Sequence, residues 1–215
     1  MKTIKVISVL AMLVCSSQLL VAQGARFGLK GGYNLAKLQI DDELDTKNRS
    51  AYQFGAFVRV PLADKLMLEP ALLYSSKGGM VEWSESYMLD ESTFIDYYFR
   101  SDIKLNYLEV PVTLSYYLTD GFYASVSPYM SFLLKDKIDA YSGECIGGNC
   151  TAVKETVEDE SDFSKTDYGI GVGLGYDITK NLYVNAQYQF GMKQIVDDEV
   201  DVFNRSLAIT VGFSF

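Results

Sequence analysis

Five charged side chains are the residues of this sequence whose types and spacing suggest chemistry. Lys30, Arg59, Glu69, Lys77 and Glu109 all fall on the polar side of segments in which apolar and polar residues alternate. Opposite charges on one side of such segments predict a network of buried ion pairs, because a buried charge is tolerated only beside a partner. We expect Glu69 and Glu109 to be neutralised by Arg59 and Lys30. The functional alternative is an ion pathway or a proton relay.

The composition removes most catalytic arrangements. The chain contains no histidine, which excludes His-dependent catalytic triads and His-ligated zinc sites. No segment places a nucleophile beside a base, and the alternate glycines over 169–175 are not followed by the helix that a phosphate-binding loop requires. We therefore expect no catalytic residues, no cofactor and no metal site. The net charge of −9 argues against nucleic-acid binding.

The first residues have the features of a secretory signal peptide. Lys2 and Lys5 precede an apolar run over 6–14 that is too short to cross a membrane as a helix. We expect residues 1–22 to be removed, with cleavage as late as Gly24 as the alternative, and residues 23–215 to form one domain. In an exported chain, Cys145 and Cys150 predict a local disulfide, and free thiols are the alternative.

The charged residues must be positioned by strands, because apolar residues recur at every second position along most of the mature chain. Strands are predicted at 26–36, 51–60, 66–77, 104–118, 122–134, 166–177, 182–193 and 203–215. Most of them have the length of a tilted membrane-spanning strand, which is ~9–11 residues. Short turns alternate with long loops between them. This pattern predicts an all-β, eight-stranded, up-and-down antiparallel transmembrane β-barrel of the outer membrane, with short periplasmic turns and long extracellular loops.

The polar side of the strands distinguishes a membrane barrel from a soluble one. It consists mostly of glycine and neutral polar residues, which suits a packed interior better than a water-facing exterior. We expect the apolar side to face lipid and the interior to be plugged, since eight strands leave room only for side chains. Phe213 and Phe215 resemble the C-terminal assembly signal that the barrel-assembly machinery reads. The alternatives are a small pore for ions or small solutes and a soluble lipocalin-like carrier of a hydrophobic ligand.

The long loops, at 37–50, 79–103, 135–165 and 194–202, carry most of the acidic residues. Acidic clusters over 41–45, 158–162 and 197–201 predict a solvated surface; divalent-ion binding, bridging to lipopolysaccharide phosphates and docking of a basic partner are the alternatives. Aromatic residues in the second loop predict either a contact surface or an extension of the hairpin beyond the membrane. They are Trp83, Tyr87, Phe94, Tyr97, Tyr98 and Phe99. The expected partners are outer-membrane lipid, lipopolysaccharide and a protein that contacts these loops.

Several segments are similar to a known family. GLKGGYNLA (28–36), the segments 54–79, 105–118 and 168–192, and the terminal SLAITVGFSF resemble the PorT-like outer-membrane β-barrel family of the Bacteroidota. The resemblance covers nearly all of the mature chain and rests on glycine and aromatic spacing, so it implies architecture more than activity. The family's namesake is implicated in the type IX secretion apparatus, and the resemblance implies a role of that kind. We expect a non-enzymatic structural or interaction protein at the cell surface.

Overall fold

The computed structural model describes residues 24–40, 46–90, 93–146, 149–158, 163–196 and 201–215. The predicted signal peptide and most of the acidic clusters lie outside these residues. The described residues contain no helix long and apolar enough to cross a membrane. They form nine strands: β1 (Arg26–Ile40), β2 (Arg49–Ala63), β3 (Leu66–Asp90), β4 (Thr93–Tyr117), β5 (Phe122–Ile146), β6 (Asn149–Glu158), β7 (Thr166–Asp177), β8 (Leu182–Gly191) and β9 (Val202–Ser214).

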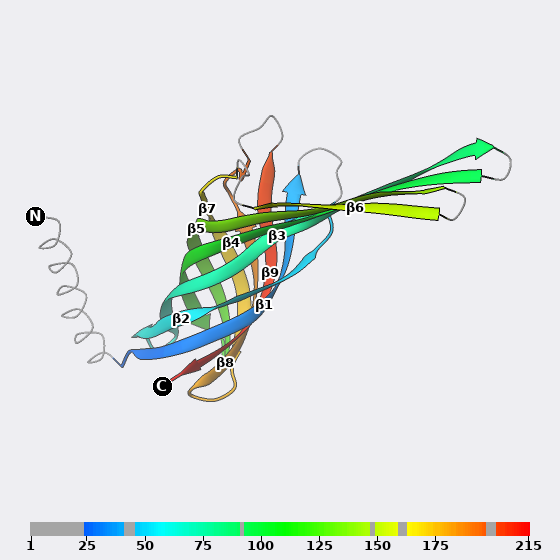
Figure 1. Cartoon of the computed structure of the whole chain (residues 1–215). Coiled ribbons are helices and arrows are strands. Elements are labelled where there is room, and N and C mark those ends of the chain that lie inside the picture. Colours follow the sequence, from blue (N-terminus) through cyan, green and yellow to red (C-terminus); the bar gives the residue numbers. More distant parts are fainter. Residues whose placement is uncertain (1–23, 41–45, 91–92, 147–148, 159–162, 197–200) are drawn as a thin grey trace, which may run out of the picture.

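Eight of these strands close into a ring (Figure 1). β1 pairs with β2 and with β9, and antiparallel pairing continues around the ring through β3, β4, β5, β7 and β8. Short turns join β2 to β3, β4 to β5 and β7 to β8. In the last two, a threonine hydroxyl accepts a backbone N–H: Phe122 donates to Thr119 and Leu182 donates to Thr179. The eight-stranded up-and-down barrel expected from the sequence is confirmed.

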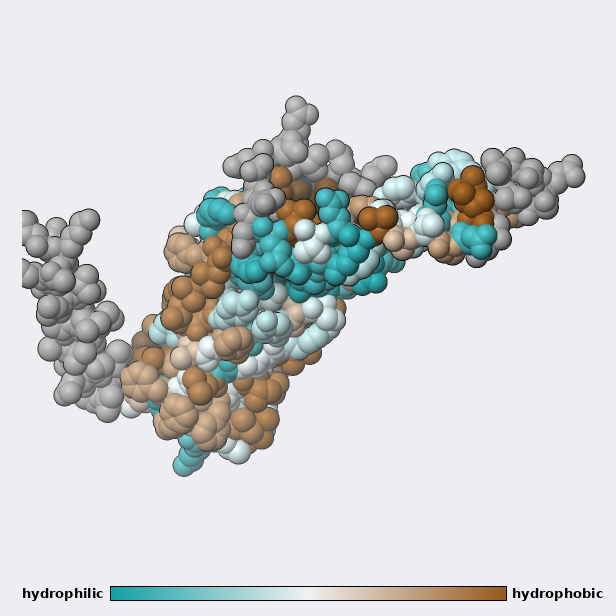
Figure 2. Space-filling model, in the orientation of Figure 1, coloured by the Kyte–Doolittle hydropathy of each residue, from teal (hydrophilic) through white to brown (hydrophobic). Residues whose placement is uncertain are grey.

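The wall of the barrel is apolar outside and polar inside. In β9, Ser206, Ala208 and Thr210 are buried, whereas Leu207 and Ile209 are 40% and 50% exposed. Apolar surface covers much of the barrel below a hydrophilic zone (Figure 2). This distribution is the reverse of that in a soluble protein and fits a wall that faces lipid. The soluble lipocalin-like alternative, which needs an apolar interior, is therefore wrong.

The outer ends of β3, β4 and β5 form a sheet in a region where the sequence pattern predicts loops. These strands continue beyond the ring, and among the described residues β6 pairs with β5 alone, from Lys137 to Ile146. The sheet, in the order β3-β4-β5-β6, projects away from the barrel (Figure 1). We call residues 80–90, 93–104, 135–146 and 149–158 the external arm. The predicted loops 79–103 and 135–165 are thus largely strands. The membrane-strand pattern fades there because both faces of the arm carry charge.

Glycines inside the wall make room for aromatic rings on the neighbouring strand. Gly175 lies directly opposite Tyr123, and Gly212 lies directly opposite Tyr183. A Cβ atom at Gly175 would lie 2.2 Å from the Tyr123 ring, and one at Gly212 would lie 2.1 Å from the Tyr183 ring. Only glycine permits these approaches, and the two tyrosines are almost fully buried in the lumen as a result.

Candidate functional site

The periplasmic half of the lumen contains an ion cluster centred on Glu69. This carboxylate accepts hydrogen bonds from Lys30 Nζ and Arg59 Nε, both at 2.9 Å, and from the Tyr183 hydroxyl at 3.0 Å. Arg59 also donates to Asp177 at 3.0 Å, and its guanidinium lies 3.9 Å from the centre of the Tyr183 ring. Lys30 lies on β1, Arg59 on β2 and Glu69 on β3, so one buried acid on β3 pairs with a cation from each of the next two strands.

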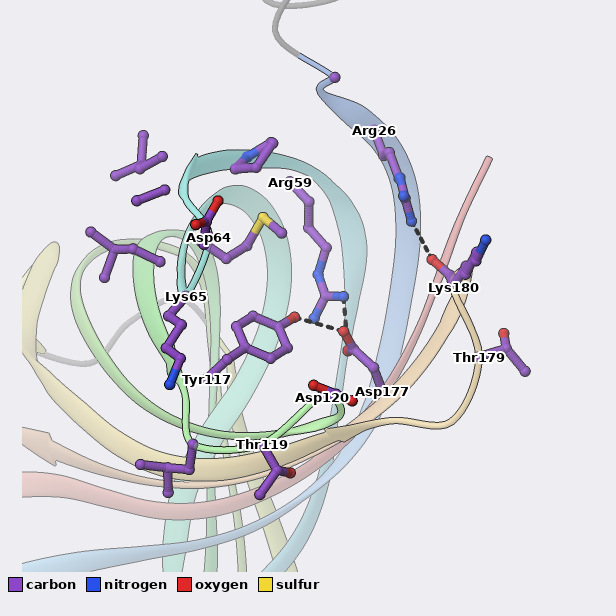
Figure 3. A pocket seen from close by; sticks show the side chains of 17 residues that line it. Arg26, Arg59, Asp64, Lys65, Tyr117, Thr119, Asp120, Asp177, Thr179 and Lys180 are labelled. Carbon is purple, nitrogen blue, oxygen red and sulfur yellow. Dashed lines mark hydrogen bonds and ion pairs between the residues drawn. The ribbon is translucent and has the colours of Figure 1, made fainter.

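An open cavity of about 960 Å³ lies at the periplasmic end of the barrel (Figure 3). Arg59, Tyr117 and Asp177 contribute to its lining, and the Tyr117 hydroxyl donates to Asp177 at 2.6 Å. Arg26 donates to the backbone carbonyl of Lys180 at the rim. The side chains that line this cavity include both signs of charge, and Arg59 belongs both to this lining and to the Glu69 cluster.

A second ion cluster lies further from the periplasm and contains Glu109. Lys77 Nζ lies 2.7 Å from Glu109 and 3.8 Å from Asp167, above the ring of Tyr129 at 3.9 Å. Gln189 donates to Glu109 at 2.9 Å. The expectation that Arg59 or Lys30 would neutralise Glu109 is therefore wrong, and Lys77 does so. The position of a side chain along the barrel axis depends on the stagger between strands. The alternation of residues along one strand does not specify that stagger.

Two acidic members of these clusters were missed in the sequence. Asp167 and Asp177 occupy the two ends of the alternate positions that include Gly169 to Gly175, all on one side of β7. Because those glycines line the lumen, the same parity places both carboxylates inside. The signal was present in the sequence, since both acids lie at the ends of the strand predicted at 166–177.

The lumen is filled between the two ends of the barrel. The void beside Glu69 and Glu109 measures only about 20 Å³, which is room for roughly one water molecule. An apolar cluster covers the extracellular end; it consists of Leu38, Leu105, Tyr107, Phe163 and Ile195. Phe163 and Ile195 come from segments predicted as loops. Among the described residues, this packing makes the interior a plug.

The external arm has two chemically different faces, because directly paired residues of antiparallel strands place their side chains on the same side. The aromatic face consists of Val81, Trp83, Tyr87, Ile95, Tyr97, Phe99, Ile103, Ile138, Ile146 and Val153 with the intervening small and acidic residues. Trp83 stacks with Phe99 at 6.2 Å between ring centres, and Tyr87 meets Tyr97 edge-on at 6.1 Å. Trp83 and Tyr87 are about half exposed.

The six aromatic residues predicted as a contact loop do not form one surface. Trp83, Tyr87, Tyr97 and Phe99 share the aromatic face, whereas the register places Phe94 and Tyr98 on the other face. Tyr98 lies against Gly143, where a Cβ atom would approach its ring to 2.3 Å. The geometry matches the extension of the hairpin beyond the barrel, and the four residues on the aromatic face stay a predicted contact surface.

The opposite face of the arm, which we call the ion-paired face, is a lattice of charges. Lys104 Nζ lies 2.6 Å from Asp139 and 3.2 Å from Asp102, and Lys137 Nζ lies 2.7 Å from Glu158. Further pairs link Arg49 to Asp102, Lys135 to Glu158, Lys154 to Asp139, and Lys47 and Arg100 to Glu82. Within the described part of the arm, every lysine and arginine lies on this face.

The basic side chains hold their acidic partners in the ionised state. The hydrogen bond from Lys104, assisted by one from Thr156, lowers the pKa of Asp139 well below its usual range. Hydrogen bonds from Lys137 and Lys135 lower the pKa of Glu158 from 4.5 to about 2. The same contact with Asp139 raises the pKa of Lys104. Glu158 is the described member of the second acidic cluster, and its partners are lysines. Among the described residues, no cluster of three or more Cys, Asp or Glu side chains could hold a metal ion.

Cys145 and Cys150 form a disulfide near the tip of the β5–β6 hairpin. They are directly opposite in the register, with their Cα atoms 4.0 Å apart. The bond therefore ties the last described pairs of the two strands together on the ion-paired face.

The chain matches a known family over most of its length. Residues 17–197 match the family model described as outer membrane protein beta-barrel domain. The chain belongs to this family. With the lipid-facing wall, this membership places the protein in the outer membrane. No protein of curated function matches the chain.

Several solved bacterial structures have a similar architecture. The chain is similar to Ail of Yersinia pestis (14% identity, 89% of this chain and 99% of that chain, TM-score 0.42). It is also similar to neisserial surface protein A (17%, 89% and 99%, TM-score 0.43). A third is the N-terminal β-barrel domain of OprF from Pseudomonas aeruginosa (16%, 90% and 98%, TM-score 0.39).

Proposed function

We propose that this outer-membrane barrel is a non-enzymatic surface protein that holds the external arm outside the cell for contact with a protein partner. The aromatic face is the proposed contact surface. The observation that carries the proposal is the one-sided placement of the cations: all the basic residues of the described arm lie on one face, and the aromatic face carries acids but no cation. A surface with exposed aromatic residues and no lysine is typical of the centre of a protein–protein interface.

The chemistry of this face specifies the kind of partner. Glu85, Glu144 and Glu155 supply negative charge around the rings of Trp83 and Tyr97. Arginine or lysine on a partner would gain both ion pairs with these acids and cation–π contacts with the rings. We therefore propose a partner with a basic, apolar surface. The resemblance to PorT-like barrels favours a component of a secretion apparatus as that partner.

Two further roles belong to the same proposal. Phe213 and Phe215, with ring centres 6.0 Å apart at the end of the chain, are the proposed recognition element for the barrel-assembly machinery. The closed lumen supports a structural role for the barrel and argues against the small-pore alternative, because the interior clusters and their apolar cover leave a void of only about 20 Å³.

Adjacent tyrosines on opposite faces allow a matched test. A photocrosslinking amino acid is introduced at Tyr97 on the aromatic face or at Tyr98 on the ion-paired face, and intact cells are irradiated. We expect a defined protein adduct from position 97 and little from position 98. The adduct partner is then purified, and its affinity for the full chain is compared between Tyr97→Ala and Tyr98→Ala at several salt concentrations.

A central aromatic contact contributes about 2 kcal/mol or more, so Tyr97→Ala is expected to weaken binding about 30-fold. Tyr98→Ala is expected to leave affinity within a few fold. Equal crosslinking from both positions, or equal loss of affinity in both variants, would contradict the proposal.

A further inference from the structure

The ion-paired face begins where the lipid-facing wall ends. On the outside of β4 and β5, Leu108 lies opposite Phe132, the next outward pair is Asn106 with Lys135, and the following pair is Lys104 with Lys137. Two residues along a strand correspond to about 7 Å. The first row of lysines therefore lies about one residue pair beyond the apolar wall, at the depth of lipid headgroups. Figure 2 shows the corresponding hydrophilic zone where the arm joins the barrel.

Basic side chains outnumber acidic ones among the described residues at this junction. We call the following residues the junction patch: Lys47, Arg49, Glu82, Arg100, Asp102, Lys104, Lys135, Lys137, Asp139, Lys154 and Glu158. Among the described residues of this patch, seven are basic and four are acidic, which is a formal excess of three positive charges. The whole chain has a net charge of −9. The cations are therefore concentrated in one place against the overall composition.

Exposure differs among the ion pairs of the junction patch. The side chains of Lys135 and Lys154 are 48% and 52% exposed, whereas that of Asp139 is 6% exposed. Asp139 is buried beneath the ammonium groups of Lys104 and Lys154, whereas Glu158 remains 41% exposed beside Lys137. Lys104 and Lys137 are directly opposite each other in the register, an arrangement that is unfavourable unless anions surround it. A further anion above these lysines would be stabilised by the same charges.

We propose that the junction patch binds the phosphorylated headgroups of lipids in the outer leaflet. Lysine and arginine are the side chains that bind phosphate, and basic residues are drawn to an anionic membrane surface. The wall directly below, which includes Leu108 and Phe132, supplies the apolar surface that acyl chains require. The continuity of this wall with the lysines selects a lipid over a free anion, because only a lipid contacts both.

This binding would orient the arm. The ion-paired face continues the outer wall of the barrel, whereas the aromatic face continues the lumen side, where Ile103 and Ile138 pack on the apolar cover. The arm extends beyond the barrel wall (Figure 1). With phosphates held on the outer face, the aromatic face is turned away from the membrane. The lipid site and the proposed protein contact are on opposite faces, so either can fail without the other.

Lipid selectivity tests the proposal on the full chain in zwitterionic micelles. Native mass spectrometry measures binding of a bisphosphorylated lipid A and of the same lipid after dephosphorylation. We expect the phosphorylated form to bind at least tenfold more tightly, with the preference reduced by salt. Lys135→Gln/Lys137→Gln should remove most of this preference, and Lys135→Arg/Lys137→Arg should keep it. Lys65→Gln/Lys180→Gln makes the same charge change at the periplasmic end and should have no effect. Equal binding of the two lipids, or equal loss in the control variant, overturns the proposal.

The single tryptophan gives an independent readout of orientation. In vesicles containing headgroup spin-labelled lipid, fluorescence of Trp83 on the aromatic face is compared with that of a Trp83→Phe/Tyr141→Trp variant. Tyr141 lies one row from Trp83 in the sheet but on the ion-paired face. We expect the tryptophan at position 141 to be quenched at least twofold more. Stronger quenching of Trp83 would place the aromatic face against the membrane and overturn the proposal.

Discussion

Removal of the Glu69 carboxylate should lower the unfolding free energy of the barrel, and the size of the loss depends on which of its hydrogen-bond partners keep another acceptor. In Glu69→Ala, Arg59 keeps its ion pair with Asp177 at 3.0 Å, but Lys30 loses its acceptor at 2.9 Å and Tyr183 loses its acceptor at 3.0 Å. An unpaired buried charge costs about 3 kcal/mol at the low end of the measured range, and the lost phenol hydrogen bond adds about 1. We expect a loss of about 4 kcal/mol in unfolding free energy, which is close to a 1,000-fold change in the folded-to-unfolded ratio.

The measurement is a urea titration in micelles, with the compact and unfolded bands separated on a gel without boiling. Thr113→Ala is the matched control, since Thr113 lies opposite Glu69 in the register but makes only a neutral hydrogen bond to Ser127 at 2.9 Å. It should cost about 1 kcal/mol. Lys30→Met/Glu69→Leu removes both charges and should recover much of the stability. A loss below about 1 kcal/mol in Glu69→Ala would refute the buried-pair reasoning and indicate a hydrated lumen.

Four further outcomes follow from the geometry. Gly175→Ala should lower folding yield severely because its Cβ atom would enter a tyrosine ring at 2.2 Å, whereas Gly31→Ala, with its nearest neighbour at 3.7 Å, should fold normally. Cys145→Ser should speed proteolysis of the β5–β6 hairpin without altering the heat shift of the barrel. Acidification should loosen the arm, because the folded pKa values of Asp139 and Glu158 lie below their ordinary values. The two carboxylates therefore stabilise the arm fully above pH about 4.5, and this contribution is lost as the pH falls toward 2 and below. Pepsin cleavage of the arm at pH 2–4 would report it. Planar-bilayer recordings should show no stable conductance, given the void of about 20 Å³.

Each of these outcomes has a contrary result. Equal folding of the two alanine variants would mean that the tyrosine rings can move aside. Unchanged proteolysis in Cys145→Ser would show that strand pairing alone holds the hairpin. An arm equally resistant to pepsin at pH 2 and pH 4 would mean that the ion pairs add nothing to its stability. Reproducible unitary currents would restore the pore alternative.

The sequence by itself determined the barrel. Alternation of apolar and polar residues located all eight wall strands, because a lipid-facing wall allows no polar residue outside and a narrow lumen allows little that is large inside. The same alternation is enough to assign Lys30, Arg59, Glu69, Lys77 and Glu109 to the lumen, because each shares the parity of the small and polar residues on its strand. The short turns identified the periplasmic end.

Only the tertiary structure decided the pairings and the arm. Glu109 meets Lys77 and not Lys30, because partners in the lumen are set by strand stagger and by which strands come to face each other after closure. The sequence pattern did not predict the strands of the arm. Both faces of the arm lie outside the membrane, so neither face has to be uniformly apolar, and the resulting mixture of acidic and aromatic residues is typical of a loop. The strand register shows an order in the arm that its composition does not show. Pairing across β3 to β6 sorts a mixed sequence into one face with every cation and another with the exposed tryptophan, since antiparallel neighbours must project to the same side.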